Sequence, residues 1–588
     1  MNIKFKGWIK KQLIIQANGL FGSLDKIWPD VKDSKWIGGT SDGWERFPYY
    51  LNGLVPLAYT LNDKLLIKKA KSYIDKIILL QSDDGNILPS NIDDNLKKDI
   101  WPLFLLLKVF SIYGNLSKDY SINEVIMKAL KYIDNHIEKK PLADWAKYRY
   151  FECYIPMLYI KQNTNDKSIH EFIKRLAIKL KQQGTNYSKI SKSWNKTSSN
   201  WGLDTHGVNI AMALKSNELY ELLTGIKDKF NSKKMLEILD KYHSTAYYHF
   251  SCDECLSGTS SYAGVELCSI VEAMYSYEIL FKLTNDTFFL NRLEKLAFNA
   301  LPATFLDNMN AHQYDQQVNQ IACLPFEKKQ VFKTNKNEAN VFGLEPNFGC
   351  CTANFGQGFP LFALSAFSIK EDILQINIPL SAKIKLNDGT IIECVSDYPF
   401  NNKVELIANK DCIVKLRNYN FTNSDDNQDF IIFNLKKNIK TKYKYVIKPK
   451  LINRNNNLFV LYYGNLLFSL PIDYKMEYYE YSKDNVNRVY PYCDYYFIPT
   501  GKFKYAFNSL EFKVVKCKYN IPFDRLNPPI KIYSNFINVD LRLKKDYQYV
   551  YNDNPHNIYN KVDKLYMVPY GNTYLRMTEM SFYNKKNS

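Results

Sequence analysis

Apolar residues recur at intervals of three and four along the first half of the chain. The segment 61–81, LNDKLLIKKAKSYIDKIILLQ, shows this spacing, and the segments 122–137 and 170–184 repeat it. Such spacing is typical of amphipathic helices, and Gly184 stands where the third of them is expected to stop. Short polar breaks join the segments, so consecutive helices must pack as antiparallel pairs. We therefore predict a helical region from about residue 5 to residue 300, built as an α/α toroid or a helical solenoid.

The pattern changes near residue 370. The segment 373–386, ILQINIPLSAKIKL, alternates apolar and polar residues in places, and Asp388-Gly389 then separates it from a second apolar stretch. An Asp-Gly pair between apolar stretches predicts a β-hairpin. Further short stretches rich in β-branched and aromatic residues follow to the end of the chain. We therefore predict an all-β region over 371–588, folded as one or two sandwiches.

Composition adds little to this picture. The net charge is 78 − 60 = +18, which could indicate a nucleic-acid partner. The excess lysine is spread along the chain and accompanies abundant Asn, Ile and Tyr, so we expect a general residue bias and no nucleic-acid partner. Aromatic residues make up 15% of the chain, with 45 Tyr. Aromatic rings stack on sugars, but they also fill protein cores.

The sequence predicts no membrane segment and no export signal. The N-terminal stretch MNIKFKGWIKKQLIIQ has no uninterrupted apolar run of the length found in signal peptides, and WPLFLLL at 101–107 ends at Lys108. The 11 cysteines are an odd number in a long chain and fit reduced thiols better than a disulfide framework. We therefore expect a cytoplasmic protein.

A Glu-x-Cys sequence lies at a predicted helix start. Apolar spacing is helical from Leu267 onward, and Gly264 favours a helix start just before it. Inside a helix Glu266 and Cys268 would point in nearly opposite directions, since each residue turns the chain by about 100°. They converge only if Glu266 is extended backbone at or before the first turn. Two readings stay open: a pair of metal ligands, or a buried Cys beside a Glu that the helix dipole favours.

Two adjacent cysteines, Cys350 and Cys351, stand in the stretch FGCCTAN. Neighbouring cysteines are poorly placed to form a disulfide with each other. Chance placement in a core, a pair of metal ligands, and a nucleophile with its neighbour are all open. With Glu266 and Cys268 the pair would make a set of one carboxylate and three thiolates that zinc accepts. The spacing is unlike any compact zinc finger, so spacing alone does not establish the site.

Two further groups of residues could carry chemistry. Cys252 and Cys255 form a C-x-x-C sequence, which suggests redox or zinc chemistry, although the surroundings lack the βαβ context of thioredoxins. Glu254, between them, could have a raised pKa and act as a general acid, or be an ordinary surface residue. His206 and His312 could bind sugar hydroxyls or serve the fold alone, and Trp44 and Trp201 are ambiguous in the same way.

The order of these motifs resembles the β-L-arabinofuranosidase family of glycoside hydrolases, family 127, and its relatives. An Asp-Glu pair comes first, then Glu-x-Cys opening a helix, then a long gap, then Cys-Cys-x-x-Asn. Further stretches look like this family in the same order along most of residues 1–370: WPDVKDSKWIGG (28–39), WERFPYYLNGL (44–54), FSCDECLSG (250–258), GVELCSIVEAMYSYE (264–278), AFNALPATF (297–305), AHQYDQQVNQ (311–320) and GLEPNFGCCTAN (343–354).

The resemblance implies a fold and an activity. It implies a catalytic (α/α)6 barrel over 1–370, followed by β-sandwich domains over 371–588. It also implies a retaining hydrolase that releases L-arabinofuranose from β-L-arabinofuranosides, with a carbohydrate substrate, no nucleic-acid or membrane partner, and a homodimer left open.

The resemblance also implies roles for individual residues. Zinc would be held by Glu266, Cys268, Cys350 and Cys351, with Cys350 as nucleophile and Glu254 as acid/base. His206, Tyr314, His312 and Trp44 would contact the sugar. By this analogy the Cys350 thiolate attacks the anomeric carbon while Glu254 protonates the leaving oxygen, and water then hydrolyses the thioglycosyl intermediate.

The sequence departs from the family pattern in two places. The relatives commonly carry Gly and His where this chain has Cys252 and Cys255, and the segment from Glu254 to Glu266 is shorter than theirs. Both departures lie beside the expected pocket, so the substrate is the part of the resemblance they affect most. Three alternatives stay open: the same machinery with another glycoside specificity, a non-catalytic carbohydrate-binding protein stapled by zinc, and a redox protein that uses Cys252 and Cys255.

Overall fold

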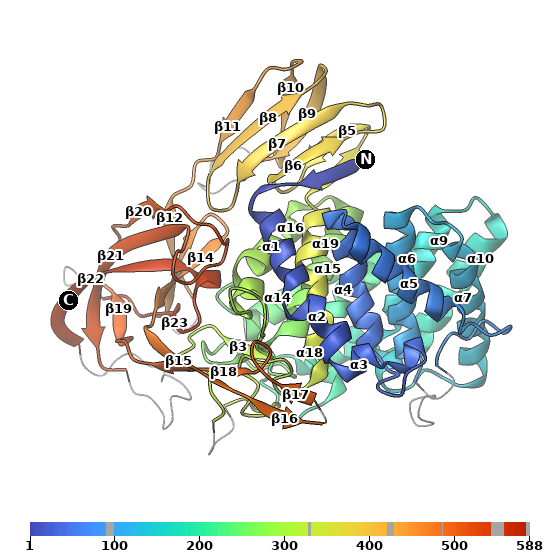
Figure 1. The fold of residues 1–588 in the computed structure, drawn as a ribbon, viewed down its shortest axis with the longest axis horizontal. Coiled ribbons are helices and arrows are strands. Elements are labelled where there is room, and N and C mark those ends of the chain that lie inside the picture. The colour runs from blue at the N-terminus through green and yellow to red at the C-terminus, as the bar shows by residue number, and fades with distance from the viewer. Residues whose placement is uncertain are drawn as a thin grey trace.

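Helices fill the N-terminal part of the chain and strands fill the C-terminal part, as the hydrophobic pattern predicts (Figure 1). The structure is a computed structural model that describes residues 1–89, 99–326, 331–419, 428–454, 457–484, 486–541 and 558–583. Buried side chains from both parts belong to one continuous hydrophobic cluster. The helical part therefore shares its core with the strands that follow it.

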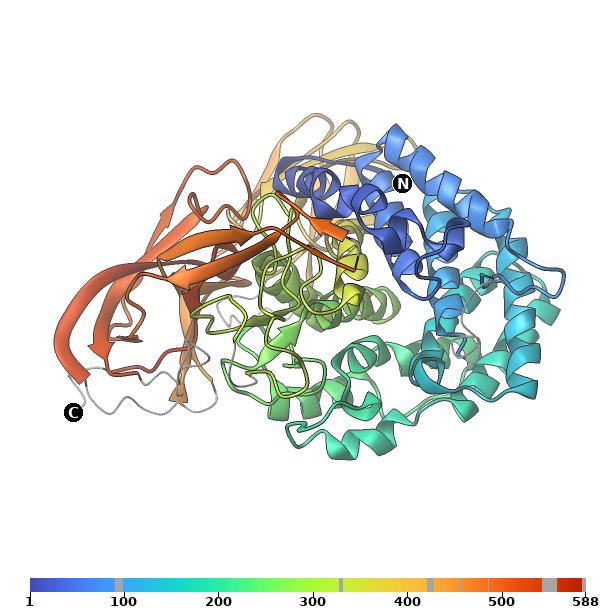
Figure 2. The same ribbon diagram turned by 60° about the horizontal axis from the view of Figure 1, so that its bottom comes forward.

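The helices follow one another around the right-hand part of the molecule in Figure 2. Each of the predicted helices is present, and the apolar face inferred from spacing is buried, as Ala70, Ile74 and Ile77 show in α5. The helices are α1 (Gly7–Asn18), α2 (Leu20–Ile27), α3 (Pro29–Lys32), α4 (Arg46–Leu61), α5 (Lys64–Ile78), α6 (Trp101–Ser117), α7 (Ile122–Lys139), α8 (Asp144–Arg149), α9 (Tyr154–Gln162), α10 (Lys167–Gln183), α11 (Tyr187–Ile190), α12 (Gly207–Ala213), α13 (Ser216–Thr224), α14 (Ser232–His243), α15 (Leu267–Thr284), α16 (Thr287–Lys295), α17 (Leu301–Ala303), α18 (Gly349–Asn354) and α19 (Gly358–Leu364).

Gly184 ends α10, as predicted, but for a reason that the sequence does not show. Its φ of −74° is open to any residue, so no left-handed turn requires glycine here. A Cβ atom at this position would lie 2.1 Å from Cδ1 of Tyr150. The glycine is therefore explained by close packing against the Tyr150 ring.

The strands form a five-stranded sheet (β1-β6-β7-β8-β11), a four-stranded sheet (β10-β9-β5-β4), an eight-stranded sheet around β12-β13-β14-β22-β21-β19, and three short ribbons. They are β1 (Asn2–Phe5), β2 (Gly264–Glu266), β3 (Asp315–Gln317), β4 (Phe367–Lys370), β5 (Ile373–Ile376), β6 (Leu380–Lys385), β7 (Ile391–Asp397), β8 (Lys403–Ala408), β9 (Cys412–Arg417), β10 (Phe430–Leu435), β11 (Thr441–Lys444), β12 (Pro449–Asn453), β13 (Phe459–Tyr463), β14 (Leu466–Pro471), β15 (Tyr474–Tyr479), β16 (Tyr481–Lys483), β17 (Val486–Arg488), β18 (Asp494–Pro499), β19 (Tyr505–Phe507), β20 (Lys513–Lys516), β21 (Ile530–Val539), β22 (Ile558–Pro569) and β23 (Arg576–Met577).

The Asp-Gly hairpin is present between β6 and β7. Gly389 has φ +82°, and the Leu386 N–H donates to the Thr390 carbonyl across the turn. The left-handed backbone is the reason that this turn favours glycine. Gly464, with φ +63°, turns the chain in the same way between β13 and β14.

The hydrophobic pattern does not predict the first strand, β1. β1 pairs antiparallel with β6, so that Asn2 faces Lys385 and Phe5 faces Ala382. The sequence reading places residues 1–370 in the helical part, yet residues 2–5 extend a sheet of the strand region. Local patterns do not predict β1 because its partner, β6, lies beyond the whole helical part in sequence.

Two strand ribbons reach back from the C-terminal part towards α18 (Figure 1). β15 pairs with β18, and β16 pairs with β17. Arg488, in β17, donates to a carboxylate oxygen of Glu345 at 3.1 Å and to its carbonyl oxygen at 3.1 Å. The C-terminal part thus supports the segment that carries the paired cysteines.

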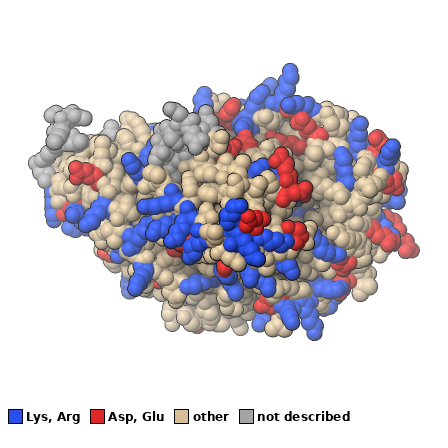
Figure 3. Space-filling view, turned by 90° about the horizontal axis from the view of Figure 1, so that it is seen from above, with Lys and Arg blue, Asp and Glu red and all other residues tan. Residues whose placement is uncertain are grey.

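Two features bear on the surroundings of the protein. None of the helices formed by the described residues is both long and apolar enough to cross a membrane. On the face shown in Figure 3, Lys and Arg side chains gather over the middle and mix with acidic side chains elsewhere.

A cluster of four charged side chains lies fully buried at the centre of the helical part. The Lys108 ammonium lies 3.5 Å from a Glu152 carboxylate oxygen and 3.4 Å from one of Glu272, and Lys215 pairs with Glu152. These residues come from α6, the 3-10 turn Tyr150–Cys153, the start of α13, and α15. Charges are stable in such a place only when they are paired and hydrogen-bonded.

Glu272 extends this cluster towards the paired cysteines. One of its carboxylate oxygens accepts hydrogen bonds from the side-chain amides of Asn354 at 3.2 Å and of Gln357 at 2.9 Å. Asn354 ends α18, and Gln357 lies in the 3-10 turn after it. The charge cluster therefore joins α15 to α18 inside the core.

We expect Lys215→Met to lower the free energy of unfolding by about 3–5 kcal/mol, because it leaves buried carboxylates without a full set of partners. Urea unfolding followed by tryptophan fluorescence measures this change in the helical part, since all 8 tryptophans lie within residues 8–201. Lys71→Met is the matched control, because Lys71 and Asp75 form an exposed pair and its loss should cost no more than about 1 kcal/mol. Equal effects of the two substitutions would contradict the role given to the cluster.

Candidate functional site

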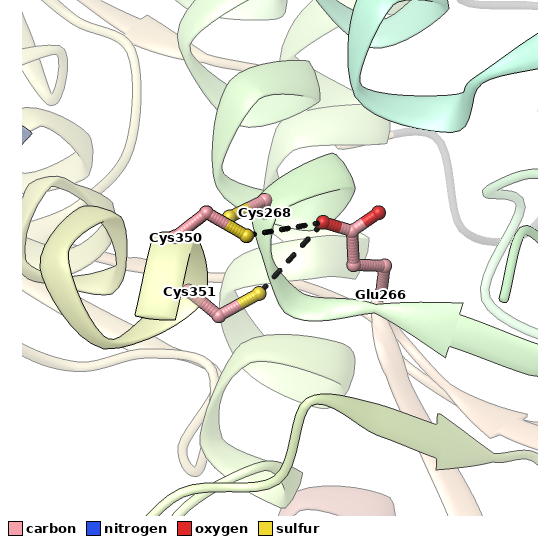
Figure 4. Close-up of side chains that lie close together, drawn as sticks. All are labelled: Glu266, Cys268, Cys350 and Cys351. Atoms are coloured by element: carbon pink, nitrogen blue, oxygen red, sulfur yellow. Dashed lines mark hydrogen bonds between the residues drawn. The ribbon is translucent and has the colours of Figure 1, made fainter. Parts of the chain in front are cut away.

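One carboxylate and three thiols converge where α15 and α18 begin (Figure 4). A Glu266 oxygen lies 4.0 Å from Sγ of Cys350 and 3.8 Å from Sγ of Cys351. Ligand atoms of Glu266, Cys268, Cys350 and Cys351 all lie within 4.8 Å of one another. The four residues that the sequence suggests as a set are thus brought together.

The backbone at Glu266 explains how it converges with Cys268. Glu266 is the last residue of β2 and the N-cap of α15, with φ −66° and ψ 134°. This is extended backbone directly before the helix, as the two-residue spacing requires. Cys268 then lies in the first turn of α15, and the two side chains point to the same place.

Gly349 allows α18 to begin close to the side chains of three other residues. A Cβ atom there would lie 2.8 Å from a Glu345 oxygen, 2.8 Å from the Trp28 ring and 3.0 Å from the Arg46 guanidinium carbon. Only a residue without a side chain fits among the three groups. Glycine before the cysteine pair thus lets the helix start in contact with these three side chains.

The donor set fits a metal ion. The second carboxylate oxygen of Glu266 is buried and has no hydrogen-bond partner among the described residues. Burial raises the pKa of Glu266 well above its usual value, and it does the same for the thiols of Cys268 and Cys351. A cation among these four groups would supply the missing partner and stabilise the deprotonated forms that ligate metals.

Cys350 differs from its neighbours in its acidity. Burial acts to raise the pKa of its thiol, but hydrogen bonds from Cys268, Cys351 and Tyr314, together with the Arg46 charge, hold the pKa well below its usual value. It is also the more accessible thiol of the pair, since Cys350 is half-buried and Cys351 fully buried. A thiolate open to a cavity is the form in which cysteine attacks carbon.

Glu254 is held in an unusual backbone conformation beside the cluster. Its φ is +129°, a region that residues with side chains rarely adopt. Its carbonyl accepts the Gly207 N–H at 2.7 Å, and its carboxylate accepts the Trp201 indole N–H at 3.2 Å and lies 3.2 Å from Nε2 of His206. These contacts all come from residues 201–207, and they hold the conformation and aim the carboxyl group.

The Tyr314 hydroxyl bridges Glu254 and Cys350. It lies 2.5 Å from a Glu254 carboxylate oxygen and 3.2 Å from Sγ of Cys350. The two groups are thus within two hydrogen-bond lengths of each other, comparable with the ~5–5.5 Å between the carboxyl groups of retaining glycosidases. Burial raises the pKa of Tyr314 well above its usual value, so its hydroxyl stays neutral.

These groups open into a cavity of ≈ 670 Å³. Glu254, Glu266, Cys268 and Cys350 lie in its wall, and so do three of the four predicted sugar-contacting residues, His206, Tyr314 and Trp44. The other rings that line it are those of Tyr49, Trp145, Trp201 and Phe348. A cavity with many rings and few convergent polar groups suits a small polar ligand that has apolar faces.

His312 lies outside this cavity wall. It is fully buried, with Nδ1 2.9 Å from the Gln313 carbonyl and Nε2 3.0 Å from the Thr352 hydroxyl. Both ring nitrogens are engaged by the protein. This corrects the prediction that His312 contacts the sugar, because it supports the helix that begins with the paired cysteines.

Sequence reasoning missed an arginine in the wall. Arg149 stacks between the rings of Trp101 and Trp145, at 4.5 and 4.4 Å from their centroids, and lies 3.2 Å from a Glu45 oxygen. Burial raises the pKa of Glu45 to about 7 despite this partner. Trp145 and Arg149 lie one turn apart on α8, so an aromatic and a cation on one helix face were the available signal.

Cys252 and Cys255 do not line the cavity. Cys255 Sγ contacts the backbone of Gly202, and Cys252 packs so closely against Gly207 that a Cβ there would lie 2.2 Å from its sulfur. Burial raises the pKa of both thiols. All 11 cysteines are free thiols.

Comparison with solved structures identifies the fold. A GH127 β-arabinofuranosidase has a TM-score of 0.67 at 14% identity, covering 99% of this chain and 97% of its own. A GH127 β-L-arabinofuranosidase from Geobacillus stearothermophilus T6 has a TM-score of 0.66 at 12% identity, with complete coverage of both chains. A structure described as a glycoside hydrolase has a TM-score of 0.67 at 12% identity, covering 99% of this chain and 96% of its own.

The sequence itself matches no protein-family model and no curated protein. At the identities of the structural matches, the likeness establishes a shared fold along the whole chain. That fold is found in the family that the motifs of residues 28–354 resemble.

We expect purified protein to contain about one tightly bound divalent metal ion per chain, because four buried donor groups converge on one point. Elemental analysis by mass spectrometry measures the content. Cys268→Ser should lose most of the metal, and Cys323→Ser, which changes a buried thiol outside the cluster, should keep it. Wild-type metal content in Cys268→Ser would contradict the ligand set.

Proposed function

We propose that this chain is a retaining glycoside hydrolase of family 127 that releases L-arabinofuranose from β-L-arabinofuranosides. One observation carries the proposal: a single cavity presents an acidic thiol, Cys350, and a carboxyl group, Glu254, bridged by the Tyr314 hydroxyl. A purely structural metal site would need neither a carboxyl group beyond its ligands nor access to a cavity. The shared fold and the motif resemblance support the same family.

Cys350 is the proposed nucleophile and Glu254 the proposed acid/base. Zinc, held by Glu266, Cys268, Cys350 and Cys351, would lower thiol pKa values and hold the sulfur groups in place. The Cys350 sulfur forms a bond to the anomeric carbon as the bond to the leaving oxygen breaks, and Glu254 gives its proton to that oxygen. Glu254 then takes a proton from water, which displaces the sulfur from the same carbon and gives overall retention.

The Tyr314 hydroxyl couples these two groups. When Glu254 is ionised, Tyr314 donates to it. When Glu254 is protonated, the same contact can run the other way, and the Tyr314 proton is then available to the Cys350 thiolate. One hydroxyl therefore contacts both the proposed acid and the proposed nucleophile.

The wider architecture follows the same proposal. We interpret the helices as the (α/α)6 barrel of the catalytic domain, nominally 1–370, and the strands over 371–588 as β-sandwich domains. The proposed partners are carbohydrates. A cytoplasmic location and a homodimer remain predictions.

Another glycoside on the same machinery is the second candidate. The segment between Glu254 and Glu266 is shorter than in the family pattern. Trp201, which contacts Glu254, is half exposed at 50%. An exposed ring beside the proposed acid is suited to contact the leaving group, the part of a substrate that varies most. The sugar is therefore tested with a panel of aryl glycosides that includes a β-L-arabinofuranoside.

We expect Cys350→Ser to abolish measurable hydrolysis, since serine cannot supply a thiolate, and Glu254→Gln to lower kcat/KM by about 10²–10⁴-fold, the usual contribution of a general acid. The loss for Glu254→Gln should be larger with a methyl glycoside than with a 4-nitrophenyl glycoside, because the poorer leaving group depends more on the proton. Release of sugar and its anomeric configuration, followed by NMR, measure both rate and retention.

The control is Cys412→Ser, which changes a half-buried thiol in β9, outside the cavity wall. It should keep wild-type activity. Full activity of Cys350→Ser or of Glu254→Gln would refute the role given to that residue. Metal binding with no hydrolysis of any glycoside would favour the carbohydrate-binding alternative.

We expect Tyr314→Phe to lower kcat by about 10²–10⁴-fold, since it removes hydrogen bonds to two groups that change charge, each worth ~1.5–3 kcal/mol. The acidic limb of the pH–rate profile should also move to higher pH. The Tyr314 hydrogen bond is one of the contacts that lower the pKa of Cys350, so its loss raises that pKa. Metal content separates this effect from damage to the metal site. An unchanged profile with normal kcat would mean that the bridge has no part in the reaction.

A further inference from the structure

A second cavity, of ≈ 450 Å³, lies where α14 and α16 meet the four-stranded sheet at β9 and the eight-stranded sheet at β12 and β13. One wall is a face of α16 that includes Phe288, Arg292 and Lys295. Residues at the end of β9 form the second wall, and residues from β12 and the β13–β14 turn form the third. Junctions between separately folded parts are frequent sites of ligand binding.

Two arginines in the wall already have partners. Arg292 binds both carboxylate oxygens of Asp240 and donates to the Tyr248 carbonyl at 2.9 Å. Arg417 binds a Glu294 oxygen at 2.9 Å and the Asn291 side chain at 2.7 Å. Arg417 joins β9 to α16 and Arg292 joins α16 to α14, so neither arginine is available to a ligand.

The acids in the wall are also engaged. Asp240 is the partner of Arg292, and Asp429 accepts the Thr287 hydroxyl at 2.7 Å. Among the described carboxylates of the wall, Asp429 has a hydrogen bond but no ion pair, so one carboxylate charge stands against the three lysines described next.

The ammonium groups of three lysines in the wall have no hydrogen bond or ion pair to any described residue: Lys295, Lys448 and Lys450. The Lys295 ammonium instead lies over the Tyr248 ring, 3.7 Å from its centroid, and 5.6 Å from that of Tyr462. Burial, followed by the Arg292 charge, lowers the pKa of Lys295 to about 7. Lys448 and Lys450 are exposed and stand at the rim. A ligand with negative charge would give all three a partner.

We infer that this cavity binds a small anionic sugar derivative, a sugar acid or a sugar phosphate, with its anionic group at Lys295 and between Lys448 and Lys450. The rings of Tyr248, Phe288, Tyr419 and Tyr462 line the cavity, each with a lysine or arginine over it, so a sugar would contact them beside those cations. Asn291 and Asn465 also line this space, and their side chains are hydrogen-bonded to Arg417 and Glu294. This inference is independent of the proposed glycosidase activity, since the cavity shares no residue with the first one.

Isothermal titration calorimetry on the full chain at constant ionic strength tests the inference. The probes are inorganic phosphate, D-galacturonate, and D-galactose as the neutral counterpart of the acid. We expect saturable binding of phosphate or galacturonate and none of galactose. Saturation by phosphate alone assigns the site to phosphorylated ligands, and saturation by galacturonate alone assigns it to sugar acids.

Variants place the binding in this cavity. Lys295→Met should weaken the anion at least 10-fold, and the double variant Lys448→Ser, Lys450→Ser should weaken it without touching the buried wall. Lys282→Met, which removes a lysine of α15 outside the cavity, should bind as the wild type does. The inference is overturned if neither anion saturates, if galactose binds as well as galacturonate, or if correctly folded Lys295→Met and the double variant both bind normally.

Discussion

The carboxylate of Glu272 fixes the relative position of α15 and α18, and the sulfur cluster depends on that position. Glu272 lies one helical turn after Cys268, and Asn354 lies one turn after Cys350, so their hydrogen bond sets the register between the two helices. Lys108 balances the charge from a third helix. A slip of either helix would separate the sulfurs and, at the same time, leave a carboxylate unpaired in the core, which is far more costly than a loose contact at a surface.

The chemistry of the cavity results from unequal treatment of similar groups. Cys350 and Cys351 are neighbours with the same intrinsic acidity, yet hydrogen bonds and the Arg46 charge act on the first, while burial dominates the second. Glu254 and Glu266 are both carboxylates, but the first contacts an indole, an imidazole and a phenol. The second meets the three thiols, and its ligand atom also lies within 4.8 Å of those of His206 and Glu254. One of each pair can thus take part in bond changes while the other holds the framework.

Local signals predicted much of the fold and of the site. Helical spacing located α5, α7 and α10, and the Asp-Gly pair located the β6–β7 hairpin. The two-residue offset of Glu266 and Cys268 predicted the extended backbone before α15. These predictions held because each depends on residues close in sequence, where periodicity and turn chemistry act directly.

The rest could not be read because it depends on contacts between distant segments. His312 looked like a sugar contact among amides, and only its two partners in the core show otherwise. Helical spacing could place Arg149 beside Trp145, but nothing local indicates its second partner, Trp101, 48 positions earlier along the chain. The Gly-like backbone of Glu254 is imposed by Gly207 and other residues outside its own loop, so no turn rule reveals it.

The pairing of β1 with β6 has a consequence for the order in which the chain can fold. Residues 2–5 leave the ribosome long before Leu380–Lys385 exist, so the whole helical part is synthesised while its leading strand has no partner. The helices can collapse as they emerge, because their contacts are closer in sequence. The five-stranded sheet cannot form its β1 edge until synthesis has passed β6, and until then β1 exposes unpaired backbone that invites association with other chains. A nascent chain stalled before residue 380 would therefore be helical, and its first strand would be open to chaperones.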